Sequence, residues 1–213
     1  MTWFGFAMVT SCLLAGAPAF AEEAAGQPDC DAIVELRAMA QAGSAVRKLM
    51  PDADPRSKEW VQAFDRATLV DRRNNEKLGR WLKSCGWPDA RNGGEEREGL
   101  VWLLVQHADQ DRPLQDFAVG LLRKQVLGGG APPIHLAYLE DRIAIGRNRP
   151  QRYGTQLQPT GPCSLELLPL DNRKDVDARR AEIGMEPLDR YLMRVREQML
   201  PASCAEAMPG GAK

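Results

Sequence analysis

The sequence predicts a mainly α-helical fold, a single-domain bundle of about six or seven helices with room for a small β-hairpin near residues 155–168. Apolar residues recur three and four positions apart through several long segments, which is the period of an amphipathic helix. These segments end at proline or glycine, as at Pro51 and Gly86. The composition, 44% hydrophobic and 27% charged, supplies enough apolar side chains for one core.

The N-terminal segment predicts export. An apolar stretch without charge ends at Ala19-Phe20-Ala21, the small-x-small pattern of a signal-peptide cleavage site, just before the first charged residue, Glu22. No Lys or Arg precedes this stretch, so an uncleaved membrane anchor is the alternative. We expect a periplasmic or extracellular protein with no stable membrane span after cleavage. The expected parts are a signal peptide over residues 1–21, one helical domain over 22–204 and a flexible tail over 205–213.

Two long helices are predicted first. Residues 31–50 carry apolar positions at helical spacing and reach Pro51. Residues 57–84 form a longer amphipathic pattern, with Ser57 as a candidate N-cap and Gly86 after its end. The short turn between them is suited to an antiparallel helical hairpin.

Four cysteines remain after the expected signal peptide, and they indicate disulfides. Four cysteines allow three pairings. In an antiparallel hairpin the start of the first helix lies beside the end of the second, which pairs Cys30 with Cys85 and leaves Cys163 for Cys204. No CxxC spacing occurs, which argues against a zinc knuckle and against a redox-active pair.

Five further helices and a hairpin follow. A strongly apolar helix is predicted over residues 96–109, and Asp111-Arg112-Pro113 forms a corner whose aspartate and early proline open the next helix. That helix ends at the glycine run 128–130, which lacks the Gly-Lys-Ser/Thr of a phosphate-binding loop. The remaining predicted elements are a helix over 134–145, the hairpin within 147–169, and helices over 173–182 and 187–199.

A polar cluster, Gln106-His107-Ala108-Asp109-Gln110-Asp111, directly follows the apolar run 100–105. A histidine and carboxylates in a hydrophobic region need partners, and they are common groups for proton transfer. We therefore take His107, Asp109 and Asp111 as candidate catalytic residues, with His107 as a base oriented by one aspartate. A Ser or Cys nucleophile is poorly supported, because the serines lie outside the motifs and the cysteines are expected to be paired.

The sequence argues against a metal site, a cofactor and a nucleic-acid partner. The nitrogen and oxygen atoms of the cluster, together with His135, could in principle bind a metal, but side chains two residues apart on a helix do not converge, so no metal site is predicted. No motif indicates a cofactor. The balance of 28 basic and 29 acidic residues argues against a nucleic-acid partner. The arginines at 142, 147, 149 and 152 are expected to form a solvated, salt-bridged edge.

Further motifs are spread along the chain in a fixed order. They are Asp71 and Asn74, Gly86-Trp87-Pro88, Gln106-His107-Ala108-Asp109 with Asp111 and Gln115, Ala137-Tyr138-Leu139 with Asp141-Arg142, Pro150-Gln151, and Tyr153-Gly154-Thr155-Gln156. Together they resemble the bacterial domain of unknown function 6624 family over roughly residues 71–191. The resemblance implies no activity. It does imply that the two main motifs and the Tyr138/Asp141/Arg142 turn belong to one site.

Three functions remain open. The first is the binding of a small molecule or peptide in a polar pocket, the second is a hydrolase that uses His107 as general base, and the third is a purely structural polar network in an envelope interaction protein. Both functional readings require the loop that carries Tyr153 to lie over the His107 corner. The expected ligand-binding residues are Gln106, Gln115, Tyr138, Asp141, Arg142, Tyr153, Thr155 and Gln156.

Overall fold

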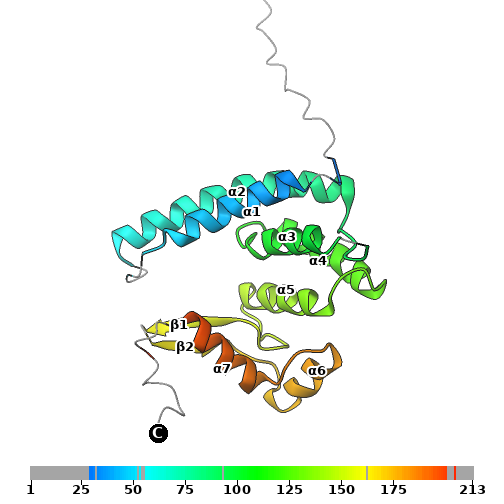
Figure 1. The fold of residues 1–213 in the computed structure, drawn as a ribbon. Coiled ribbons are helices and arrows are strands. Elements are labelled where there is room, and N and C mark those ends of the chain that lie inside the picture. The colour runs from blue at the N-terminus through cyan, green and yellow to red at the C-terminus, as the bar shows by residue number, and fades with distance from the viewer. Residues whose placement is uncertain are drawn as a thin grey trace, which may run out of the picture.

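The computed structural model describes residues 29–31, 33–51, 53, 56–92, 94–161, 163–200 and 204. The signal peptide expected over 1–21 and the tail expected over 205–213 lie outside these residues. In the described part of the chain, seven α-helices are layered from a long helix pair at one end to a two-stranded antiparallel sheet and two helices at the other (Figure 1). The predicted mainly α fold with a small hairpin is confirmed.

The first two helices form the antiparallel pair that the sequence predicts. Helix α1 spans Val34–Lys48 and α2 spans Lys58–Cys85, and they lie side by side at the top of Figure 1. Ser57 caps α2, because its side chain accepts the Trp60 N–H at 3.3 Å. The buried Asn74 joins the pair, since its Nδ2 donates to the Met39 carbonyl at 3.0 Å.

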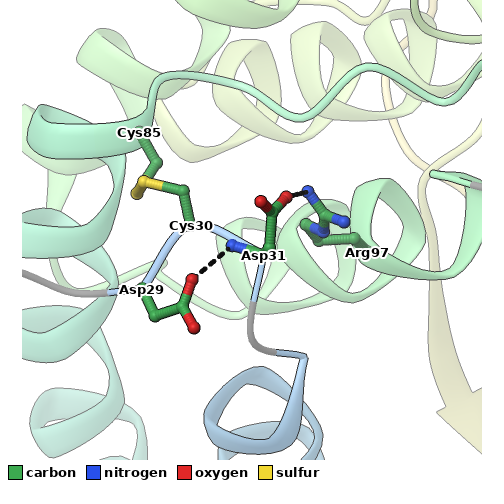
Figure 2. The surroundings of a disulfide bond; sticks show 5 residues. All are labelled: Asp29, Cys30, Asp31, Cys85 and Arg97. Atoms are coloured by element: carbon green, nitrogen blue, oxygen red, sulfur yellow. Dashed lines mark hydrogen bonds and ion pairs between the residues drawn. A yellow bond between two sulfur atoms is a disulfide. The ribbon is translucent and has the colours of Figure 1, made fainter.

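A disulfide between Cys30 and Cys85 closes the end of this pair where α1 begins and α2 finishes (Figure 2). The two Cα atoms are 5.5 Å apart. Next to the bond, the carboxylate of Asp31 pairs with Arg97 at 3.0 Å, which attaches the start of the described chain to the next helix. This predicted pairing is confirmed.

Three helices form the centre of the molecule: α3 over Glu95–Gln106, α4 over Arg112–Leu127 and α5 over Pro133–Gly146. Helix α3 contacts α1, α2, α4 and α5. Its apolar residues therefore surround the helix instead of forming one stripe. The fully buried leucines and valines of this core include Leu78, Leu82, Val101, Leu122 and Leu139.

One carboxylate lies inside this core with its partners. Glu98 is 1% exposed and accepts the Trp87 indole N–H at 3.0 Å, while its Oε2 lies 2.8 Å from His135 Nδ1. The His135 ring also stacks on Trp102, with the ring centroids 4.4 Å apart. His135 is thus engaged by the core of the bundle and takes no part in the cluster around residue 107.

The third helix ends earlier than predicted, at Gln106 instead of residue 109. The N–H groups of His107 and Ala108 donate to the carbonyls of Leu104 and Val105, each three residues back, which tightens the last turn and stops the helix. Ala108 is fully buried, so the chain turns against the core at this point. Asp109 consequently lies in a corner between helices and not on a helix.

The C-terminal part builds a second, smaller core. Strands β1, Leu157–Gly161, and β2, Ser164–Leu167, form the hairpin; the 3₁₀ turn Arg173–Asp175, helix α6 over Val176–Glu182 and helix α7 over Leu188–Met199 follow. The Cys163–Cys204 disulfide, also as predicted, ties residue 204 to the hairpin. No helix in the described residues has the length and apolar character needed to cross a membrane.

Removal of the Cys30–Cys85 disulfide is expected to lower the free energy of unfolding by about 4 kcal/mol, because the bond restricts an unfolded loop with a sequence separation of 55 residues. Urea denaturation of the Cys30→Ser/Cys85→Ser variant measures this loss. The matched variant, Cys163→Ser/Cys204→Ser, opens a shorter separation of 41 residues and should lose slightly less. A loss below about 1 kcal/mol for the first variant would mean that packing alone holds the two helix ends together.

Candidate functional site

A hollow of about 330 Å³ lies between α1, α2 and the C-terminal end of α3. Apolar side chains, namely Met39, Ala40, Leu103 and Leu104, form one part of its wall. The polar part of its lining comes from Ser44, Arg47, Lys48, Asp71, Asn74, Asn75 and His107. Of the eleven candidate catalytic and ligand-binding residues inferred from the sequence, His107 alone lines this hollow.

His107 is the C-cap residue of α3, and its imidazole is half-buried at the hollow. Within the described residues no side chain or backbone group hydrogen-bonds to this imidazole. Burial lowers the pKa of His107 from 6.5 to about 4; the guanidinium groups of Arg47 and Arg142 lower it as well, and Asp109 acts in the opposite direction. The ring is therefore neutral at pH 7, with one nitrogen able to donate and the other able to accept a hydrogen bond.

An ion pair between α1 and α2 forms one side of the hollow. Arg47 Nη2 donates to Asp71 Oδ2 at 2.7 Å, and Arg47 Nη1 donates to the Gly43 carbonyl at 3.0 Å. The missing side chain at Gly43 makes room for this guanidinium, since a Cβ there would lie 3.1 Å from Nη1. Burial raises the pKa of Asp71, and Arg47 opposes that effect.

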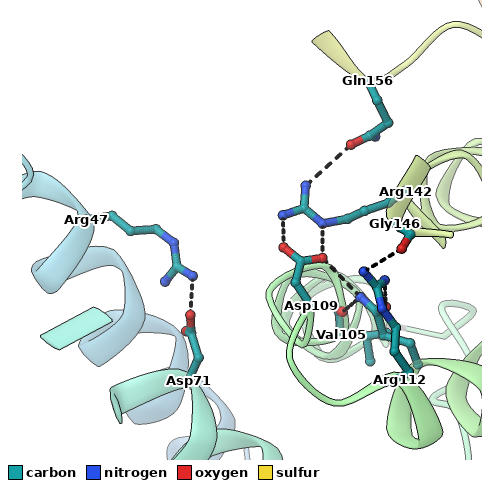
Figure 3. A network of polar contacts seen from close by, with 9 residues as sticks. Arg47, Asp71, Val105, Asp109, Arg112, Arg142, Gly146 and Gln156 are labelled. Atoms are coloured by element: carbon teal, nitrogen blue, oxygen red, sulfur yellow. Dashed lines mark hydrogen bonds and ion pairs between the residues drawn. The ribbon is translucent and has the colours of Figure 1, made fainter. Parts of the chain in front are cut away.

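A second ion pair faces the first across the corner, as Figure 3 shows. Arg142, on α5, binds Asp109 at two points, with Nε 2.9 Å from Oδ1 and Nη2 2.5 Å from Oδ2. Its Nη1 donates to Gln156 Oε1 at 3.4 Å. The Gln-His-Ala-Asp and Tyr-Gly-Thr-Gln motifs are thus joined through Arg142. Asp71 is near enough to this pair for Asp109 to raise its pKa and Arg142 to lower it.

The Tyr-Gly-Thr turn is held from inside by Asp141, which is completely buried. Oδ1 accepts the N–H groups of Arg152 at 2.7 Å and Tyr153 at 3.0 Å, and Oδ2 accepts the N–H of Thr155 at 3.0 Å and its hydroxyl at 2.9 Å. Burial raises the pKa of Asp141, while these donors lower it. The turn also needs its glycine, because Gly154 has a φ of +74° and a Cβ there would lie 2.7 Å from Leu188 Cδ1.

The carbonyl groups of this turn are bound as well. The Tyr153 carbonyl accepts Arg180 Nη1 at 2.6 Å, and the Thr155 carbonyl accepts the Tyr191 hydroxyl at 3.0 Å. Asp141 already accepts hydrogen bonds from the amides of Tyr153 and Thr155, so these amides are occupied within the protein. The loop instead positions Gln156 against Arg142.

The other candidate residues hold the corner together. Asp111 is the N-cap of α4, because its Oδ1 accepts the Leu114 N–H at 3.0 Å. Gln115 is completely buried and donates to the Val105 carbonyl at 3.3 Å and to Asp109 Oδ1 at 3.4 Å. Gln106 is buried too, and its Nε2 has no hydrogen-bond partner among the described residues.

Tyr138 lies away from the hollow. Its ring makes edge contacts with Trp102 and Tyr191, with centroid distances of 5.9 and 6.4 Å. Tyr138, Asp141 and Arg142 share one turn of α5 but contact different neighbours. Tyr138 packs on aromatic rings, Asp141 binds the Tyr-Gly-Thr turn, and Arg142 binds Asp109.

Several residues of the hollow belong to no motif in the sequence, chiefly Ser44, Arg47, Lys48 and Asn75. Asp71 and Asn74 belong only to the motifs that carry the family resemblance. A usable signal was present on α1, where Ala40, Gly43 and Ser44 place small residues three and four positions apart on one helical face. A helix with such a face leaves space beside its neighbour.

A wider hollow of about 390 Å³ lies beside α5 and the loop that follows it, and its lining residues are Glu140, Asp141, Ala144, Arg149, Pro150, Arg152 and Asp171. Its acidic residues are partly engaged, since Asp141 holds the loop and Glu140 pairs with Arg123 at 2.7 Å. Among the described residues, no three His, Cys, Asp or Glu side chains gather as metal ligands.

Replacing Asp141 by Asn is expected to destabilise the protein by about 2–4 kcal/mol, because an amide nitrogen would face backbone N–H groups that now donate to a carboxylate. Chemical denaturation measures the loss, and hydrogen exchange at Tyr153 and Thr155 should accelerate in parallel. The control is Asp171→Asn, at an exposed carboxylate. Equal stability of the two variants would contradict the structural role of Asp141.

The neutral state of His107 makes stability depend on pH. Its folded pKa of about 4 lies below the unfolded value of 6.5, so the unfolded chain binds the extra proton, and stability falls as the pH drops from 6.5 towards 4. The full effect is about 3 kcal/mol. A His107→Gln variant should lose this part of the pH dependence. NMR titration of the imidazole checks the pKa directly, and a midpoint near 6.5 would contradict the prediction.

Comparisons with known proteins place this architecture in a family. Neither a search of curated proteins nor a search of solved structures found a match. A family model described as "Family of unknown function (DUF6624)" matches residues 29–200, which span all the helices and both strands described above. The chain therefore belongs to the DUF6624 family of unknown function.

Proposed function

We propose that this protein is an exported binding protein that holds a small molecule in the hollow between α1, α2 and α3, beside His107. One observation carries the proposal: the His107 imidazole is half-buried at the wall of the hollow and has no hydrogen-bond partner among the described residues. The ring nitrogens line an open hollow and are engaged by no protein group in the described part of the chain, so one can donate a hydrogen bond to a ligand and the other can accept one.

The size and lining of the hollow support a small occupant. Its volume of about 330 Å³ is at the lower end of the range of ligand sites, which favours a metabolite over a folded peptide. Leu103 and Leu104 offer an apolar wall, while Arg47 and Asn75 offer polar contacts. Such a division suits a molecule with one apolar and one polar end.

The same geometry supports hydrolysis less well. A general base works best when its pKa is near the working pH, whereas the pKa of His107 is lowered to about 4. Neither predicted orienting carboxylate hydrogen-bonds to the imidazole, because Asp109 is held by Arg142 and Asp111 caps α4. The Thr155 hydroxyl, in the loop near this corner, donates to Asp141 and is therefore not free to act as a nucleophile.

The purely structural alternative accounts for the carboxylates and leaves His107 unexplained. Asp109, Asp111 and Asp141 each hold a helix end, an arginine or a turn, as polar groups at helix corners commonly do. The histidine makes no comparable contact. Export is supported by the two disulfides, which are typical of oxidising compartments.

A thermal-shift screen tests the proposal. The compounds are small monocarboxylates, primary amines, amides and monosaccharides, and a binder stabilises the folded state by mass action. The variant Ala40→Leu fills the hollow, while Ala42→Leu adds the same side chain on the exposed face of the same helix. We expect at least one class of compound to raise the Tm of the wild type and of Ala42→Leu but not that of Ala40→Leu.

Two results would count against the proposal. One is the absence of any stabilising compound in the screen. The other is equal stabilisation of Ala40→Leu and Ala42→Leu, which would place the binder elsewhere on the protein.

A further inference from the structure

The charges around the hollow are unequal, and the excess is positive. The charged side chains in its lining are Arg47, Lys48 and Asp71. Arg47 and Asp71 bind each other at 2.7 Å, whereas no carboxylate of the described residues pairs with Lys48. One cation, exposed at the rim, thus remains without a counter-charge in a hollow that is also lined by a neutral imidazole and an apolar wall.

We propose that the ligand is a small organic acid, that its carboxylate binds at the polar end of the hollow among Lys48, Arg47 and His107, and that His107 takes up a proton as the anion enters. This inference rests on the proposed binding function and adds the chemical class of the ligand. The apolar part of the acid packs on Met39, Leu103 and Leu104.

The groups that face His107 explain the coupling. Arg47 on α1, Asp109 at the α3–α4 corner and Arg142 on α5 act on its charge. Lys48 on α1 and Asp71 on α2 line the same hollow. Arg47 pairs with Asp71, and Arg142 pairs with Asp109. The two carboxylates that could stabilise an imidazolium are therefore already neutralised. The ring therefore stays neutral while the hollow contains only water.

An incoming carboxylate changes this balance. It brings an unneutralised negative charge and a hydrogen-bond acceptor to a ring that has no such partner, and both favour the imidazolium form. The proton comes from solvent, and no covalent bond between heavy atoms is made or broken. Binding should therefore strengthen as the pH falls from neutral, until the acid itself becomes protonated.

Hexanoate is the probe that tests the ligand class, and hexanamide is its neutral match with the same tail. Isothermal titration calorimetry at about pH 6, where hexanoate is almost fully ionised, measures the affinity of both. We expect hexanoate to bind at least about tenfold more tightly than hexanamide. Repeating the titration in MES and in bis-Tris, which both buffer near this pH and differ in ionisation enthalpy, should reveal net proton uptake. Hexanesulfonate shows whether the proton is taken up by the protein or by the ligand. The sulfonate accepts no proton at this pH, so any uptake on its binding belongs to the protein.

Three variants assign the effect to residues. Lys48→Gln should weaken hexanoate binding about fivefold, whereas Lys83→Gln, at an exposed lysine on α2, should leave it unchanged. His107→Asn should abolish proton uptake while the protein stays folded. The apolar wall contributes equally to hexanoate and hexanamide, so neither lysine variant should alter the binding of hexanamide.

The results separate this inference from the proposed function. If hexanamide binds as well as hexanoate, or if neither binds while a compound of another class stabilises the wild type, the ligand is not an acid, and the hollow remains a binding site. If hexanoate binds without proton uptake, or if His107→Asn retains the uptake, the role of His107 is wrong. If Lys48→Gln and Lys83→Gln bind hexanoate equally, the carboxylate is not at the proposed end.

Discussion

The Asp109 carboxylate is held by Arg142 at two points, and this ion pair fixes the corner between α3 and α4 against α5. Opposite charges at this separation, in a partly buried setting, neutralise each other's field. Asp109 therefore does not orient the neighbouring histidine, and Arg142 opposes its effect on the pKa of that ring. His107, on which the proposed function depends, is left without a side-chain hydrogen-bond partner among the described residues.

Helix α5 connects the corner to the Tyr-Gly-Thr-Gln loop through two successive residues that point in different directions. Asp141 is turned into the loop and accepts its amides, whereas Arg142 is turned towards Asp109 and Gln156. Adjacent residues on a helix project about 100° apart, so one turn of α5 holds both structures without crowding. The loop is thereby tied to the corner through Gln156 and Arg142, with its amides held by Asp141.

The long α1–α2 pair completes the site from the opposite side. Its small residues at Ala40, Gly43 and Ser44 keep α1 from filling the space beside α3, and the Arg47–Asp71 pair borders the hollow that remains. The Cys30–Cys85 disulfide at the other end of the pair limits how far the two helices can separate. A hollow formed by three helices, two of them cross-linked, is suited to a ligand that binds without a large conformational change.

Local patterns in the sequence were enough to place the helices, the Ser57 and Asp111 caps, the hairpin and both disulfides, because helical period, capping and a short interhelical turn act over neighbouring residues. They also located the His107 corner. Only the tertiary structure decided that Asp109 pairs with Arg142, that Asp141 faces the loop, and that the hollow lies under α1 and α2. These choices depend on contacts between residues far apart in the chain, such as the 33 positions between Asp109 and Arg142. A charged side chain needs a particular partner only where it is buried, and these side chains become buried only when the helices pack.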